Sequence, residues 1–89
     1  MEQIEEAKLE LIKLNLEENI SFTQMRIIFE DLLYYEESDR VYINKDPKHD
    51  IVLKTIYELR KRNVPDAIIL VSMGILKREF EHSLERKEI

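Results

Sequence analysis

The apolar positions of the first eighteen residues recur at helical spacing and form two separate stripes. One stripe has the 3-4-3 spacing of a buried helix face, and its members are Ile4, Ala7, Leu11 and Leu14. A second stripe lies almost opposite at 100° per residue, and its members are Leu9, Ile12 and Leu16. We therefore predict a helix over residues 2–18 that is either enclosed within a bundle or leaves one apolar face for association.

A second helix is predicted from the signals at its start. Ser21 and Gln24 have the spacing of a capping box, in which each side chain bonds the backbone N–H of the other residue. Ile20 and Met25 stand where a hydrophobic staple packs. The spacing beyond them predicts a core stripe that consists of Met25, Ile28, Phe29 and Leu32.

Residues 38–45 lose the helical period, and apolar and polar side chains alternate there. This pattern predicts a short extended segment, either a wing or a loop. Asp46 followed by Pro47 then predicts the start of a third helix, because aspartate caps a helix and proline suits its first position. The inner stripe of that helix is Val52, Ile56 and Leu59.

Three consecutive basic residues, Arg60, Lys61 and Arg62, end the predicted third helix. Cations in a last helical turn interact favourably with the negative end of the helix, by roughly 0.3–1 kcal/mol each. Asn63 is well suited to the left-handed conformation that closes a helix. The basic run thus has a structural explanation, and contact with nucleic acid is the alternative.

The last predicted helix runs from Pro65 to about residue 87. Residues 67–76 are apolar nearly all round, which predicts a place at the centre of a bundle. One apolar stripe continues into the charged second half, and it consists of Ile69, Met73, Leu76, Phe80 and Leu84. We expect that charged half to project or to pair with another chain. Residues 1–89 are thus predicted to form a single, compact all-α domain of four helices.

Length and composition narrow the class of protein. Eighty-nine residues suffice for one domain, and 44% apolar with 37% charged residues is typical of a folded chain. The lack of cysteine excludes disulfides and thiolate metal ligands. A net charge of −5 disfavours a protein that acts mainly through phosphate contacts. The N-terminus is acidic and no apolar run reaches the ~20 residues of a membrane span, so we expect a soluble cytoplasmic protein without a membrane partner.

Residues with catalytic or metal-binding chemistry are few and scattered. The single glycine, Gly74, lies inside a predicted helix, so the sequence has no glycine-rich phosphate loop. His49 stands near Asp46 and Asp50, but this trio has no further ligand at a fixed offset and is typical of a solvated helix start. Ser21 is used in capping and has no histidine near it in sequence to act as a base. We expect no enzymatic activity, no cofactor and no metal ion.

Several motifs between residues 20 and 70 follow one another in an order that a known family shares. Ile20 to Phe22, with Arg26 beyond, are followed by an Arg-x-Tyr motif at Arg40 and Tyr42, and then by LKTIYELRKRNVPDAI at residues 53–68. Together they resemble the winged helix-turn-helix domain of MerR-type regulators. The resemblance implies that Arg26 faces the major groove of DNA and that Arg40 and Tyr42 contact phosphates from a wing. It also implies a long last helix, residues 70–87, that mediates dimerisation.

Two hypotheses for function follow. In the first, the stripe of Leu9, Ile12 and Leu16 is an interaction surface, because a contiguous exposed apolar patch normally marks an association site. The chain is then a small non-enzymatic regulatory or adaptor protein that acts through protein–protein contacts, as a homodimer or with another protein. In the second, it is a DNA-binding transcriptional regulator with a MerR-like winged helix-turn-helix.

Overall fold

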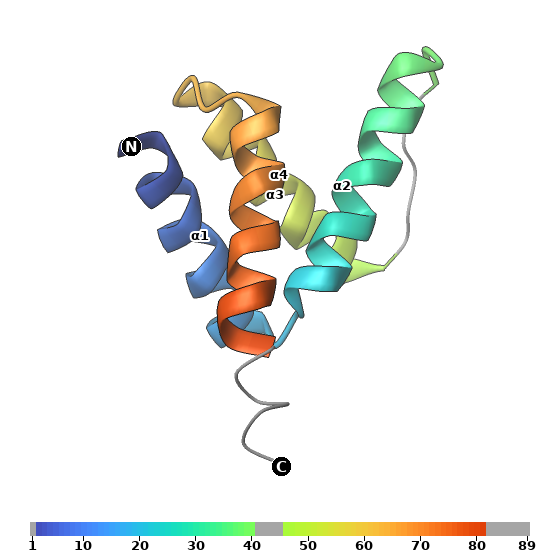
Figure 1. Cartoon of the computed structure of the whole chain (residues 1–89). Coiled ribbons are helices and arrows are strands. Elements are labelled where there is room, and N and C mark those ends of the chain that lie inside the picture. The colour runs from blue at the N-terminus through green and yellow to red at the C-terminus, as the bar shows by residue number, and fades with distance from the viewer. Residues whose placement is uncertain (1, 41–45, 82–89) are drawn as a thin grey trace.

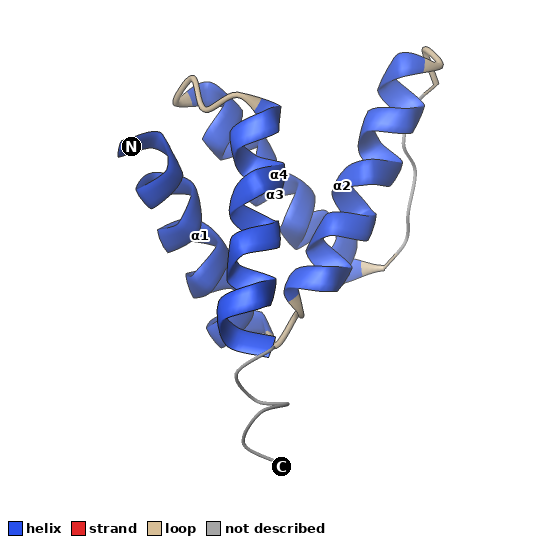
Figure 2. Cartoon of the chain, viewed as in Figure 1, coloured by secondary structure: helices blue, strands red, loops and turns tan. Residues whose placement is uncertain are grey.

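The computed structural model describes residues 2–40 and 46–81, and all regular structure among them is helical (Figure 2). The α-helices of this part are α1 (Glu2–Glu18), α2 (Phe22–Glu37), α3 (Pro47–Lys61) and α4 (Asp66–Leu76). A π-helical turn, η1 (Lys77–Glu81), continues α4. The prediction of an all-α, four-helix fold is confirmed. Of the predicted extended segment, residues 41–45 lie outside the described residues, as do residues 82–87 of the predicted last helix.

The four helices form two pairs that run in opposite directions (Figure 1). α1 and α4 run one way and pack against each other, whereas α2 and α3 run the other way. α3 and α4 each contact the other three helices, and α4 packs more extensively against α1 and α2 than α3 does. α2 leans away from α4 toward its own C-terminal end, and in Figure 1 the two helices diverge.

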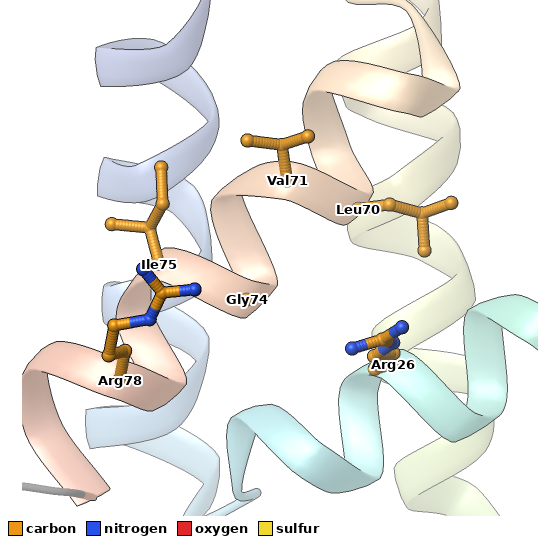
Figure 3. Close-up of a pocket in the computed structure, with 6 residues that line it drawn as sticks. All are labelled: Arg26, Leu70, Val71, Gly74, Ile75 and Arg78. Atoms are coloured by element: carbon orange, nitrogen blue, oxygen red, sulfur yellow. The ribbon is translucent and has the colours of Figure 1, made fainter.

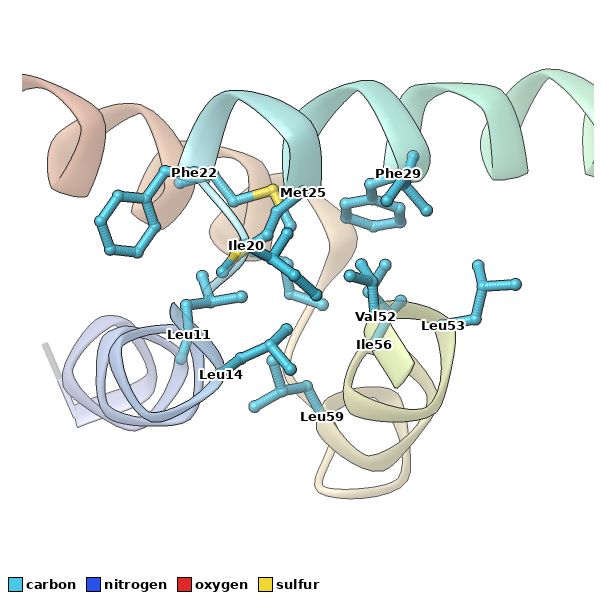
Figure 4. Close-up of a cluster of buried hydrophobic side chains, with 14 of the residues drawn as sticks. Leu11, Leu14, Ile20, Phe22, Met25, Phe29, Val52, Leu53, Ile56 and Leu59 are labelled. Carbon is cyan, nitrogen blue, oxygen red and sulfur yellow. The ribbon is translucent and has the colours of Figure 1, made fainter. Parts of the chain in front are cut away.

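One hydrophobic core joins the helices (Figure 4). All members of the inner stripes predicted for the first three helices lie in it except Ile4, which is only partly buried, and Leu11, Phe29 and Ile56 are fully buried. Full burial of one such side chain stabilises the fold by roughly 1.5–3 kcal/mol. The predicted stripe of α4 is buried as far as Leu76, whereas Phe80 in η1 is 47% exposed.

Local signals account for where the helices begin and end. The capping box of α2 is formed, since Gln24 N–H donates to Ser21 Oγ at 3.1 Å and Ser21 N–H donates to Gln24 Oε1 at 3.2 Å. At the start of α3, Lys48 N–H donates to the carboxylate of Asp46 at 3.0 Å. Asn63 has a φ of 64°, the left-handed conformation predicted for it. The hydrogen bonds at Ser21, Gln24 and Asp46 satisfy backbone groups that helix ends leave without an intrahelical partner.

One face of α4 is open to solvent, although the helix packs against the other three helices as expected of a central segment. Val71 is 49% exposed, Ala67 is exposed, and Leu70 and Ile75 are only partly buried. The physical reason is geometric. α4 has three helical neighbours in the described part of the chain, and three neighbours do not enclose a helix with apolar side chains all round.

Candidate functional site

The second apolar stripe of α1 faces solvent at two of its three positions. Leu9 is 68% exposed and Leu16 is 76% exposed, whereas Ile12 packs partly against the core. The two leucines are seven residues apart, so they lie two turns, about 10.5 Å, from each other on the same side of the helix. α1 is therefore not enclosed within the bundle, and Leu9 and Leu16 form its exposed apolar face.

The exposed face of α1 also carries acidic side chains. Glu5 and Glu2 are exposed and precede Leu9 by about one and two helical turns, on the same side of the helix. Over its whole length α1 has six glutamates and two lysines. Lys13 is also exposed and lies between the two leucines, so this face combines apolar area with negative charge at its N-terminal end.

A second exposed apolar surface is a shallow groove between α2 and α4, with a volume of about 330 Å³ (Figure 3). Its apolar lining comes from α4, and the residues are Leu70, Val71, Gly74 and Ile75. Arg26 of α2 and Arg78 of η1 add positive charge, and in Figure 3 they stand on either side of Gly74. We call this surface the α2/α4 groove.

Gly74 is exceptional in the groove because nothing within the described structure requires a glycine there. A Cβ atom added at Gly74 would meet no neighbouring atom within 4 Å. Its φ is not positive, so its backbone conformation is open to any residue. A glycine inside a helix costs roughly 0.5–1 kcal/mol relative to alanine. The only signal in the sequence was that the chain has a single glycine and places it within a helix.

Arg60, the first residue of the basic run, lies at the junction of three helices. Its Nη1 and Nη2 atoms donate to the two carboxylate oxygens of Glu36 in α2, each at 2.8 Å. Its Nε and Nη2 atoms donate to Asp66 at the start of α4, at 2.9 and 3.0 Å. The guanidinium also lies 5.8 Å from the ring centres of Phe29 and Tyr57. Hydrogen bonds to Glu36 and Asp66 raise the pKa of Arg60 above its ordinary value.

The other two basic residues of the run also have acidic neighbours. Arg62 Nη1 lies 3.4 Å from carboxylate oxygens of both Glu6 and Glu10 in α1, and the contact with Glu10 chiefly raises the pKa of Arg62. Lys61 Nζ lies 3.7 Å from Glu58 Oε1. These contacts support the structural explanation of the run, because each cation has an acidic partner within the same chain.

Of the residues that the MerR-like resemblance implies for DNA binding, the structure describes Arg26, near the start of α2, and Arg40, beyond its end. Arg26 is exposed and its Nε donates to Glu30 Oε1 at 2.8 Å, within α2. Arg40 is exposed beyond the end of α2, where its backbone N–H donates to the carbonyl of Tyr35 at 2.8 Å. Tyr42 lies outside the described residues. The winged-helix hypothesis stays a prediction, and the structure places Arg26 in the α2/α4 groove.

The start of α3 was the one candidate for a metal site. His49 Nδ1 lies 3.3 Å from Asp46 Oδ2, so the two residues contact each other across the first turn. Within residues 2–40 and 46–81, no group of three or more acidic or histidine side chains has an arrangement that fits a metal ion. In the same part of the chain, no helix has both the length and the apolar character that crossing a bilayer requires.

The fold and its surfaces define the class of the chain, which is a small all-α domain of four helices with two exposed apolar surfaces. No protein-family model, curated protein or solved structure matches the chain. The face of α1 and the α2/α4 groove are thus the features from which a function is inferred.

Proposed function

We propose that this chain is a small non-enzymatic regulatory or adaptor domain that acts through protein–protein contacts and associates with a second copy of itself through α1. The observation that carries the proposal is the exposure of Leu9 and Leu16, both more than two-thirds accessible, on one side of α1. A single exposed leucine is ordinary on a protein surface. Two leucines seven residues apart have the spacing of side chains that pack between helices.

The balance of buried and exposed surface adds to the proposal. A chain of this length buries only about 60–65% of the surface that its unfolded form exposes. The described part leaves several large hydrophobic side chains exposed, and they are Leu9, Leu16, Ile27, Tyr34, Tyr57, Val71 and Phe80. An interface that covers part of this area stabilises the assembly by roughly 25 cal/mol per Å² of apolar surface removed from water.

The test replaces Leu9 and Leu16 together by glutamate and measures molar mass by sedimentation equilibrium, with circular dichroism as the check on folding. We expect a dimeric parent chain and a monomeric double variant with unchanged helicity, because both substitutions lie on an exposed face. The matched control replaces Ile27 and Tyr34 by glutamate, since both are exposed hydrophobic residues of α2 and they are also seven residues apart. That control should remain dimeric. A parent chain that is monomeric at every concentration, or a dimeric Leu9/Leu16 variant, would contradict the proposal.

A further inference from the structure

We infer that the α2/α4 groove receives the exposed face of α1 from a second copy of the chain. The inference rests on the proposed function and adds the surface on which α1 docks. Each copy then supplies one α1 face and one groove. Two reciprocal contacts close the assembly as a two-fold dimer, in which the same pair of surfaces meets twice.

The spacing of small residues on α4 matches the spacing of leucines on α1. Ala67 and Gly74 are seven residues apart on α4, as Leu9 and Leu16 are on α1. Ala67 is exposed, and Gly74 leaves open space where a Cβ atom would be. When two helices pack, large side chains of one helix enter spaces between side chains of the other. The two leucines therefore fit over the two small residues, and this fit explains the otherwise unexplained glycine.

The charges of the two surfaces are complementary. The groove carries Arg26 and Arg78, whereas the α1 face carries Glu2 and Glu5. Arg26 is paired with Glu30, but Arg78 is exposed and makes no ion pair with any residue in the described part of the chain. Arg78 is thus available to a carboxylate from outside. Opposite charges across an interface favour the correct partner and disfavour others.

The charges also select the direction in which α1 lies in the groove. In an antiparallel arrangement, Leu9 lies over Gly74, so that Glu5, four residues before Leu9, comes beside Arg78, four residues after Gly74. A parallel arrangement places Leu9 over Ala67 and moves Glu5 away from Arg78. The antiparallel arrangement also brings opposite ends of the helix dipoles together.

A dimer formed by two grooves facing each other is disfavoured by the same charges. It would bring the arginines at positions 26 and 78 of both copies together, and like charges in one interface repel. The acidic face of α1 has the opposite charge and the matching spacing. It is therefore the surface of this chain that suits the groove.

The first test fills the groove without disturbing the core. Gly74→Leu should retain or raise the melting temperature, because the position is open and leucine is a better helix former than glycine. It should abolish dimerisation, because its side chain occupies the space that Leu9 of the second copy needs. Val71→Glu, at an exposed position in the groove, serves as an independent second variant. If Leu9→Glu/Leu16→Glu chains are monomeric but both groove variants still dimerise, the proposed function stands and the groove inference is overturned.

The second test mixes two variants, one with an altered α1 face and one with an altered groove. The Leu9→Glu/Leu16→Glu chain keeps its groove, and the Gly74→Leu chain keeps its α1 face. Each alone should be monomeric, whereas an equimolar mixture should form a 1:1 heterodimer held by one remaining contact. Sedimentation of the mixture with one chain fluorescently labelled reports this directly. A mixture that stays monomeric would overturn the inference.

The third test exchanges the charges of the antiparallel pair. Glu5→Arg and Arg78→Glu should each weaken dimerisation by on the order of tenfold, because each places like charges together. The chain that carries both substitutions should dimerise nearly as tightly as the parent. Lys61→Glu is the control for a change in net charge at a site outside both surfaces. A double variant weaker than either single variant would contradict the antiparallel pairing.

Discussion

Arg60 and Glu36 are joined by two parallel hydrogen bonds of 2.8 Å, although 24 residues separate them in the sequence. The Nε atom of Arg60 also donates a hydrogen bond to Asp66, the first residue of α4. One side chain therefore connects the end of α2 and the start of α4 to the end of α3. The planar guanidinium permits this, because it offers several donors in a fixed geometry.

The first prediction concerns Arg60→Lys. Lysine retains the charge but lacks the fork, so we expect a loss of roughly 1–2 kcal/mol in the free energy of unfolding, measured by urea titration. Lys61→Ala is the control, since that side chain is 75% exposed and should change stability by no more than about 0.5 kcal/mol. Equal losses in the two variants would contradict a special role for Arg60.

The same variant has an expected pH dependence. Pairing with Glu36 and Asp66 raises the pKa of Arg60, so its stabilisation is fully present below the ordinary arginine pKa and is lost only as pH rises through the raised value. The difference in stability between parent and Arg60→Lys should therefore stay constant between about pH 6 and pH 9. Urea titrations at both ends of this range check it.

The second prediction separates the two stripes of α1. Leu11→Ala should cost about 2–5 kcal/mol, because Leu11 is fully buried and its truncation leaves a cavity. Leu9→Ala removes the same atoms from an exposed position and should change monomer stability by no more than about 0.5 kcal/mol. Thermal unfolding of both variants under dilute conditions, where the chain is monomeric, compares them. Similar costs would place both stripes in the core.

The third prediction concerns the turn between α3 and α4. Asn63 has a positive φ, which costs residues with a Cβ atom roughly 1–2 kcal/mol unless they are asparagine or aspartate. Asn63→Ala should therefore destabilise the chain by about 1 kcal/mol, whereas Asn63→Gly should be neutral or slightly stabilising. Melting temperatures of the two variants give the comparison. If glycine proves as harmful as alanine, the contribution of Asn63 comes from its side chain.

The fourth prediction addresses DNA. Because the cations of the basic run have acidic partners, we expect no binding to a labelled mixed-sequence duplex at low salt, measured by fluorescence anisotropy. Micromolar binding that collapses as salt rises would favour the winged-helix hypothesis instead. In that case Arg26→Ala and Arg40→Ala should each weaken binding without changing stability.

The ends of the helices could be predicted because their signals are local. The capping box at Ser21, the cap at Asp46 and the left-handed turn at Asn63 each depend on residues within a few positions of one another. The inner stripe of α1 could be predicted for the same reason, since spacing alone defines a helix face. Its outer stripe was compatible with either burial within the bundle or exposure for association, because the sequence does not tell whether another helix packs against a second apolar face.

The α2/α4 groove could not be predicted, because its residues are far apart in the sequence. Arg26 and Arg78 line the same groove only because α2 packs beside α4. The exposed face of α4 could not be predicted either, because the sequence of a helix that is apolar all round does not indicate which side its neighbours leave open. The partners of Arg60 posed the same problem, because Glu36 belongs to a different helix.

The pairing of α1 with α4 bears on how the chain folds as it is made. α1 precedes the other described helices in the sequence, yet it packs more extensively against α4 than against any of the others. α1 thus lacks its main packing partner until α4 has left the ribosome, and the pairing of distant segments slows folding relative to a chain whose sequential helices pair. Folding of the four helices is therefore expected to complete only after α4 has been synthesised.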